Sequence, residues 1–206
     1  MPVATRTVEL FGGAMRIRLP TSMVDVSDFR QVPDNQEVYA DSTTGASFII
    51  ELLSRQRSVA NEDAGAFFFH DLANDNGCSL DDIQGCVTTE LPPSAYPRLS
   101  AVSSSSSGAQ RCDFACLTTG MQCISKYTNE EAKKNDVFVG LVVLRFTPPV
   151  STEVLVSLSC PACVHPESSE ARVVERLVTE EDRHDILQQA TASLEVLEWA
   201  LFVPEE

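Results

Sequence analysis

The chain has 206 residues, of which 43% are hydrophobic, and this is enough to bury the core of one sizeable domain. Its formal net charge of −15 makes nucleic acid and anionic membranes poor partners and a basic protein a favourable one. No apolar run approaches the roughly 18 residues that direct membrane insertion requires, and the N-terminus lacks the basic start and apolar core of a secretory signal.

The first quarter of the chain reads as short strands joined by turns. Four strands are expected, at residues 7–10, 15–19, 36–40 and 47–53. Gly12 and Gly13 suit a tight hairpin turn between the first two.

A helix is expected to follow. Asn61 has the residue type of an N-cap, and Gly77 is a plausible stop. The spacing of its apolar residues predicts a buried stripe, so we interpret its phenylalanines as core: Phe67, Phe68 and Phe69.

The middle of the chain contains a strand expected at residues 83–89 and then a proline- and serine-rich stretch. The serine run at residues 103–107 cannot contribute to a core. We therefore expect residues 94–108 to form a mobile surface loop inside a single domain that spans residues 1–206.

The remaining sequence predicts more strands and a final helix. The strands are expected at residues 112–117, 122–127, 137–146 and 153–159. A long helix, capped by Ser168 or Ser169, is indicated by apolar residues that recur every three or four positions from Val173 to Leu201. Grouped strands with helices at intervals indicate an α+β fold with a mostly antiparallel sheet.

Residues 24–38 form a segment in which acidic and apolar residues are interspersed. Its carboxylates are Asp25, Asp28, Asp34 and Glu37. Its apolar residues are expected to pin the segment to a core, so that the acids point outward: Val24, Val26, Phe29, Val32 and Val38. The last 40 residues carry a net charge of −8 and residues 1–53 only −3, so the importance of this segment rests on its pattern and not on charge density.

Three motifs occur in a fixed order: LFGGA at residues 10–14, DVSDFRQVPDNQEV at residues 25–38 and IIELL at residues 49–53. In this the chain resembles the Ran guanine-nucleotide release factor family, the Mog-type proteins. Weaker likeness continues through residues 67–72 and 137–146, whereas residues 77–108 have no evident counterpart.

The resemblance implies a Mog/PsbP-like fold, with an antiparallel sheet of about six strands flanked by helices. It also implies a protein of the nucleus and cytoplasm that binds the small GTPase Ran and promotes release of its bound guanine nucleotide, regulating nucleocytoplasmic transport. Such a protein acts by binding and not as an enzyme, needs no cofactor, and is expected to be a monomer. The residues that we place on the Ran-binding surface are Asp25, Asp28, Arg30, Pro33, Asp34, Asn35, Gln36, Glu37 and Glu51.

Glu51 permits two interpretations. Strand alternation places its side chain on the same face as Ile49 and Leu53, where an unpaired buried carboxylate would be costly. Arg30 is a candidate partner, which would make Glu51 structural, whereas the resemblance assigns this acid to the Ran-facing surface. The family often has a second acid three residues later, where this chain has Ser54.

The seven cysteines are odd in number and scattered, which favours reduced free thiols. Cys160 and Cys163 have the spacing of a redox pair or of half a zinc site, to which Cys112 and Cys116 would supply the other half. A redox pair should open a helix directly after a strand, whereas here Val164, His165 and Pro166 intervene before the expected start of the helix. We expect plain thiols and no metal.

The sequence therefore leaves two hypotheses for the function. The first, a nucleotide-release factor for Ran, is what the resemblance implies. No nucleophile elbow, phosphate-binding glycine loop or zinc-protease motif indicates an enzyme instead. The alternative is a non-catalytic adaptor or trafficking protein with the same fold, which binds another protein without driving nucleotide exchange.

Overall fold

The computed structural model describes residues 3–100, 112–125 and 132–202. The strands are β1 (Thr5–Leu10), β2 (Met15–Pro20), β3 (Val24–Asp25), β4 (Gln36–Ala40), β5 (Ser47–Ser54), β6 (Ile83–Glu90), β7 (Phe114–Ile124), β8 (Asn135–Arg145), β9 (Thr152–Cys163) and β10 (Glu195–Val196). The α-helices are α1 (Asn61–Asp75), α2 (Pro97–Ser100) and α3 (Glu180–Ser193). The 3-10 turns are η1 (Phe11–Gly13), η2 (Leu80–Asp82), η3 (Pro93–Ala95), η5 (Glu170–Arg172) and η6 (Trp199–Leu201).

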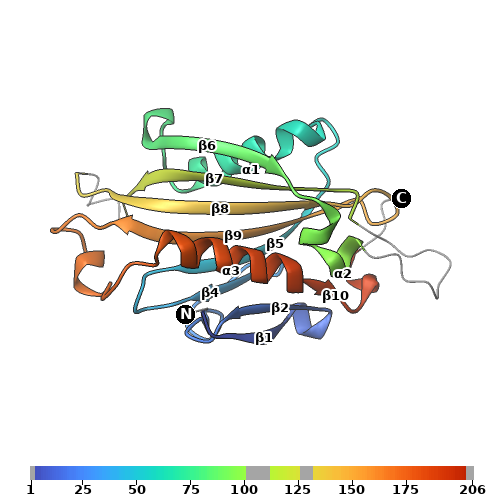
Figure 1. The fold of residues 1–206 in the computed structure, drawn as a ribbon, viewed down its shortest axis with the longest axis horizontal. Coiled ribbons are helices and arrows are strands. Elements are labelled where there is room, and N and C mark those ends of the chain that lie inside the picture. The colour runs from blue at the N-terminus through green and yellow to red at the C-terminus, as the bar shows by residue number, and fades with distance from the viewer. Residues whose placement is uncertain (1–2, 101–111, 126–131, 203–206) are drawn as a thin grey trace.

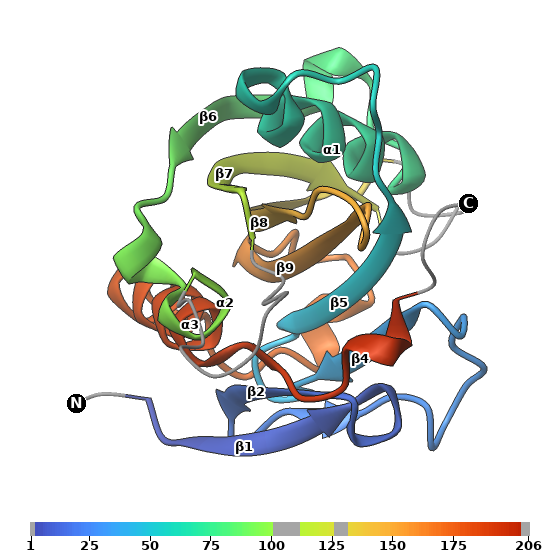
Figure 2. The same cartoon turned by 90° about the vertical axis from the view of Figure 1, so that its right-hand side faces the viewer.

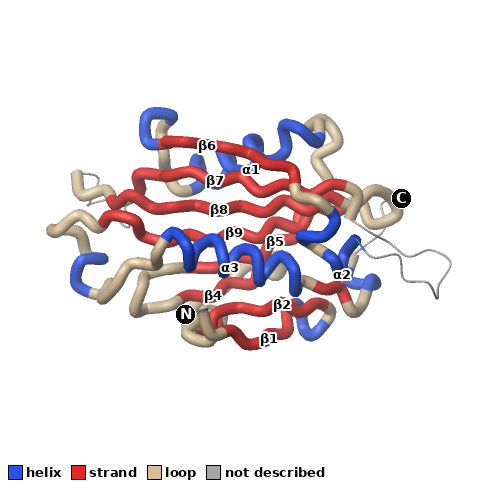
Figure 3. The backbone as a smooth tube through the Cα atoms, in the orientation of Figure 1, coloured by secondary structure: helices blue, strands red, loops and turns tan. Residues whose placement is uncertain are grey.

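The strands form two antiparallel sheets. One has seven strands in the order β3-β4-β5-β9-β8-β7-β6, and the other has three in the order β1-β2-β10. In Figure 1, α3 crosses the near side of the large sheet and α1 lies behind β6 and β7. Figure 3 shows the long strands stacked between these helices. We call the side that faces α3 and the small sheet the inner face, and the side that faces α1 the outer face.

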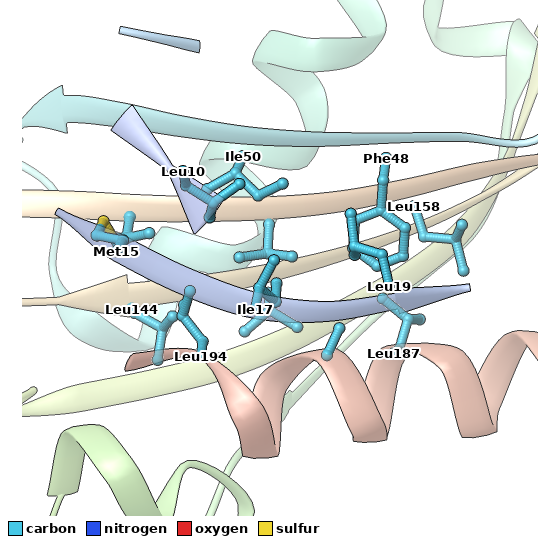
Figure 4. Close-up of a cluster of buried hydrophobic side chains, with 14 of the residues drawn as sticks. Leu10, Met15, Ile17, Leu19, Phe48, Ile50, Leu144, Leu158, Leu187 and Leu194 are labelled. Carbon is cyan, nitrogen blue, oxygen red and sulfur yellow. The ribbon is translucent and has the colours of Figure 1, made fainter. Parts of the chain in front are cut away.

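The inner face carries the larger core. Alternate residues of β5 and β9 pack there against β2 and α3, and most are fully buried. Figure 4 shows side chains of β2 between those of β5 and α3: Met15, Ile17, Leu19, Phe48, Ile50, Leu187 and Leu194. Because full burial of one such side chain is worth about 1.5–3 kcal/mol, this layer is the main source of stability.

The outer face is covered by α1 along only part of its width. The helix packs on β6, β7 and β8, and Ala64, Phe68 and Phe69 form a second core with side chains of these strands. Phe67 contradicts the prediction that all three phenylalanines are core, because it is 42% exposed. Figure 2 places α1 at the β6–β7 end of the molecule and β1 and β2 at the opposite end. The helix therefore leaves the outer face of β4 and β5 without a helical cover.

The α+β prediction is confirmed, as are the hairpin at Gly12 and Gly13 and the strand at residues 36–40. The expected single sheet of about six strands is instead a seven-stranded sheet with a separate three-stranded one. The strands expected at residues 112–117 and 122–127 are one continuous strand, β7, as far as the described residues extend. Gly120 does not break β7: a Cβ there would lie 2.7 Å from Phe69 Cζ, so glycine permits close packing of α1.

The prediction of a surface loop at residues 94–108 is wrong for the first part of that range. Residues 93–100 contain η3 and α2, and the side chains of Tyr96 and Leu99 are almost completely buried in the inner core. The rest of that prediction, including the serine run, lies outside the described residues.

The C-terminal helix is shorter than predicted. It begins at Glu180, and the hydroxyl of Thr179 accepts a hydrogen bond of 3.1 Å from the Asp182 N–H, so Thr179 is the cap and not Ser168 or Ser169. The helix ends at Ser193 because the chain then extends into β10, which pairs with β2.

Asn61 is the first residue of α1 and not its cap, because its side-chain oxygen has other partners. It accepts hydrogen bonds from Arg55 Nη2 at 3.2 Å and from Arg145 Nη1 at 3.0 Å. Arg145 also forms a fully buried ion pair of 2.7 Å with Glu153 and donates to the carbonyl oxygens of residues 56 and 59. This network fixes the connection between β5 and the start of α1.

None of the helices in the described part of the chain is long and apolar enough to cross a membrane.

Candidate functional site

The acidic segment at residues 24–38 lies at the edge of the large sheet. The Val26 N–H donates to the Val38 carbonyl, and the N–H groups of Phe29 and Arg30 both donate back to the Val26 carbonyl. The Gln36 N–H donates to the Pro33 carbonyl at the start of β4. Two backbone turns therefore give this segment a defined path, as expected for a preformed binding loop.

Strand register divides the segment between the two faces of the sheet. Gln36 pairs with Glu51, so both side chains lie on the outer face, whereas Glu37 pairs with Ile50 on the inner face. Asp25 pairs with the buried Tyr39, so it also lies on the inner side. Of the acids predicted to bind Ran, Asp25 and Glu37 therefore lie on the inner side of the sheet, whereas Glu51 lies on the outer face.

Glu37 holds the hairpin turn between β1 and β2. Its Oε1 accepts a hydrogen bond of 2.5 Å from the Phe11 N–H, and Phe11 has a φ of 51°. Burial raises the pKa of Glu37, the Phe11 hydrogen bond opposes this shift, and the Asp25 carboxylate adds to it. The same environment raises the pKa of Tyr39 to about 12, chiefly through burial. These contacts give Glu37 a structural role in the turn.

Glu51 lies on the outer face, in a cavity of about 140 Å³ between β5 and α1. Its Oε1 accepts hydrogen bonds from Gln36 Nε2 at 2.8 Å and Asn35 Nδ2 at 3.4 Å. The suggested pairing with Arg30 is wrong, since no ion pair joins them in the described residues and both partners of Glu51 are amides. Amides orient the carboxylate without neutralising its charge.

The same cavity brings Glu51 close to acids that the sequence analysis missed. Asp71 and Asp75, four residues apart on the exposed side of α1, line it together with the apolar Leu53 and Leu72. No lysine or arginine lines it within the described part of the chain. Their spacing of four residues is a sequence signal that places both aspartates on one face of a helix, but it does not indicate which strand lies beside them.

The apolar residues of the 24–38 segment only partly serve as anchors. Val38 is buried, as predicted, whereas Val24 is 50% and Phe29 78% exposed, so the prediction that they pin the segment is wrong. Val26 and Arg30 line a second cavity, of about 600 Å³, over the outer face of β4 and β5.

The remaining predicted residues lie on the loop surface. Asp28, Pro33 and Asp34 are all exposed, as is Asn35. Their positions leave them accessible to a partner but do not by themselves create a pocket.

The cysteines are dispersed through the fold. Cys160 and Cys163 lie at the end of β9 and not at the start of a helix, with Cys160 buried and Cys163 exposed. Cys112 and Cys116 belong to separate cores. Burial raises the pKa of Cys160 to about 12, which disfavours a reactive thiolate. Among the described residues, no group of three or more potential ligands could hold a metal ion.

Comparison with known proteins gives concordant matches. A family model described as "Ran-interacting Mog1 protein" matches residues 8–161. The Ran guanine nucleotide release factor of Danio rerio is 38% identical over 162 residues, covering 79% of this chain and 81% of the relative. The nuclear import protein mog1 of Schizosaccharomyces pombe is 30% identical over 155 residues, covering 75% and 76%.

A solved structure supports the fold. The crystal structure of the Saccharomyces cerevisiae Ran-binding protein Mog1p matches with a TM-score of 0.64 and 22% sequence identity, covering 98% of this chain and 100% of that one. At this identity the match bears on the fold alone.

Proposed function

Because the chain belongs to the Ran-interacting Mog1 protein family, we propose that it binds the GTPase Ran and promotes release of its bound guanine nucleotide. The observation that carries this proposal is the arrangement around Glu51. Neutral amides orient this carboxylate, and it faces an open cavity that contains two further acids and no cation in the described residues. A basic surface of a protein partner would complement it.

Nucleotide release requires differential binding. A protein that binds loaded and empty Ran equally well shifts nothing, so this chain must bind the nucleotide-free state more tightly. A thousandfold acceleration needs about 4 kcal/mol of additional stabilisation in the transition state. Carboxylates supply it by attracting the lysines, or the surroundings of the Mg²⁺ ion, that otherwise hold the nucleotide phosphates.

The proposed Ran-binding residues then divide into two groups. We assign direct contact to Asp28, Asp34 and Glu51, which are exposed or open to the cavity, together with Arg30 and Asn35. The others support the surface from within the segment: Asp25, Pro33, Gln36 and Glu37. Preformed turns in this segment lower the ordering cost of binding.

This function requires no catalytic side chain and no cofactor, because the protein acts through its affinity for Ran. A monomer suffices, since the proposed surface lies within one chain. A Ran regulator would be expected in both nucleus and cytoplasm, between which nuclear import operates. We propose this distribution for the chain, and localisation of the tagged protein by fluorescence microscopy tests it.

The decisive experiment mixes the protein with Ran that carries a fluorescent guanine nucleotide and follows the loss of fluorescence. We expect faster release with the wild-type protein. Asp34→Lys should lower the release rate at least about tenfold, since a like charge in the interface costs about 1.4 kcal/mol or more. A control that neutralises two acids of α3, Glu180→Gln with Glu181→Gln, should alter only the association rate, and less so at high salt.

Binding without faster release would instead identify the protein as an adaptor. An active Asp34→Lys variant together with an inactive α3 control would show that the Ran-binding surface lies elsewhere on the molecule.

A further inference from the structure

Three cavities on the outer face adjoin one another through shared lining residues, and we treat them together as one depression. The cavity beside Glu51, the cavity of about 600 Å³ beside Arg30 and a third of about 200 Å³ all include Ile49 in their lining. The second and third also share Gly45, Ser47 and Glu170. We call this depression the Ile49 trough. It runs over β4, β5 and β9 where α1 does not cover the sheet.

The fold holds both walls of the trough in place. On one side, the turn that contains Val26 and Arg30 is bound to β4 through the Val38 carbonyl. On the other side, the segment after η5 is bound to the loop before β5, because the Glu175 N–H donates to the Thr43 carbonyl at 2.8 Å. This segment presses on Gly45, where a Cβ would lie 2.9 Å from Val174 Cγ2. The trough is therefore built by residues far apart in sequence.

The chemistry changes along the trough. One end has the three carboxylates of Glu51, Asp71 and Asp75, and the floor is apolar around Ile49. At the other end, Arg30 is the only basic residue among the described residues that line the three cavities. Asp41 and Glu170 line the same cavity as Arg30, and Val173 adds an apolar side chain to it. Phe29 is exposed directly beside Arg30. Exposed apolar side chains around a charged groove are characteristic of protein-interaction surfaces, in which buried aromatic residues contribute much of the affinity.

We propose that a segment of Ran lies in the Ile49 trough, with apolar side chains over Ile49 and Val173 and a lysine or arginine side chain at the Glu51 end. This rests on the proposed function and extends the contact surface beyond the acidic segment, to η5 and the C-terminal end of α1. A protein segment fits better than a small ligand, because the carboxylate of Glu51 and the apolar side chain of Val173 line different cavities of the trough, and only an extended occupant reaches both. The acidic end excludes an anionic polymer.

The test uses one substitution in the lining of the trough, one in the turn that carries Arg30, and two matched controls at the opposite edge of the large sheet. Val173 is 52% exposed and Val87, on the edge strand β6, is 60% exposed, so Val173→Glu is compared with Val87→Glu. Phe29 is 78% exposed and Leu80, in η2 next to β6, is 79% exposed, so Phe29→Ser is compared with Leu80→Ser. The high exposure of all four side chains means that folding should be retained, which thermal melting checks.

The measured quantity is the dissociation constant for nucleotide-free Ran. We expect Val173→Glu and Phe29→Ser each to weaken binding about tenfold or more, as removal of an interface hot spot does, with controls within about twofold of wild type. Wild-type affinity in both trough variants, with Asp34→Lys still defective, would overturn the trough while leaving the proposed function intact. Equal loss in the matched controls would also overturn it. Failure of the wild-type protein to bind Ran would refute the proposed function and the trough together.

Discussion

The two faces of β5 have opposite roles although they come from one short sequence. Phe48 and Ile50 point to the inner face and are completely buried against β2 and α3, whereas Ile49 and Glu51 point to the outer face and remain partly exposed. The difference arises from what covers each face and not from the residues of the strand. The inner face contributes most of the buried apolar contacts, and the outer face, where α1 stops short, is where we propose that a partner binds.

The largest effect is expected from breaking the network that fixes the start of α1. Arg145→Met should destabilise the protein by about 3–5 kcal/mol, because it leaves the Glu153 carboxylate buried without its partner. It also leaves the carbonyl oxygens of residues 56 and 59 without their donor. Urea unfolding, followed by circular dichroism, measures the loss.

The double variant Arg145→Met with Glu153→Met is the control. It removes both buried charges, so it should recover part of the lost stability. A single variant as stable as the wild-type protein would mean that this network does not determine where α1 begins.

A smaller effect separates the two faces directly. Ile50→Ala should cost about 2–5 kcal/mol, because it leaves a cavity in the inner core, whereas Ile49→Ala should cost about 1 kcal/mol or less on the open face. For Ran affinity the order of the two variants should reverse: Ile49→Ala should weaken binding more than Ile50→Ala, because Ile49 lines the trough. Comparable unfolding free energies for the two variants would contradict the division between the faces.

The smallest effect concerns Glu37, the acid on the inner side of β4. Its pKa is raised in the folded protein above the ordinary value of 4.5, so its contribution to stability is present below that value and falls as the pH rises through the window above it. Glu37→Gln keeps an acceptor for the Phe11 N–H and removes the charge. The variant should therefore match wild type near pH 4 and exceed it near pH 7, by roughly a few tenths of a kcal/mol because solvent screens a half-exposed group.

Thermal melting at both pH values tests this, with Asp34→Asn as the exposed control that should show no such trend. A less stable Glu37→Gln variant at pH 7 would show that the charge itself holds the hairpin turn.

Local patterns were sufficient to predict most of the strands. Alternation and turn residues identified the hairpin at Gly12 and the strand at residues 36–40, because both depend on neighbours in sequence. The C-terminal helix was extended too far in both directions. Val173 and Leu197 continue the helical spacing, but Val173 lies in a segment bound to the loop before β5, and Leu197 follows a strand paired with β2. Those contacts are tertiary, and they cannot be predicted from the spacing of apolar residues along the sequence.

The candidate site was predictable in position but not in composition. The motif around Glu51 led to the outer face, whereas the contribution of Asp71 depends on how far α1 extends across the sheet. The sequence predicts that Phe29 is an anchor, whereas it is exposed. An apolar residue in a loop does not by itself indicate whether its side chain packs inward. The split between Glu37 and Glu51 follows from strand register, which the pairing of β4 with β5 sets.

The central claim is that Ran contacts the open part of the outer face, and hydrogen–deuterium exchange of the protein with and without nucleotide-free Ran tests it most directly. Both walls of the trough contain turn and loop amides outside the sheet ladders, so their exchange should respond to binding. We predict slower exchange in residues 26–35 and 170–176, and no change in η2 or in the solvent-facing first turn of α3. Slower exchange in η2 and β6, with residues 26–35 unchanged, would contradict this account.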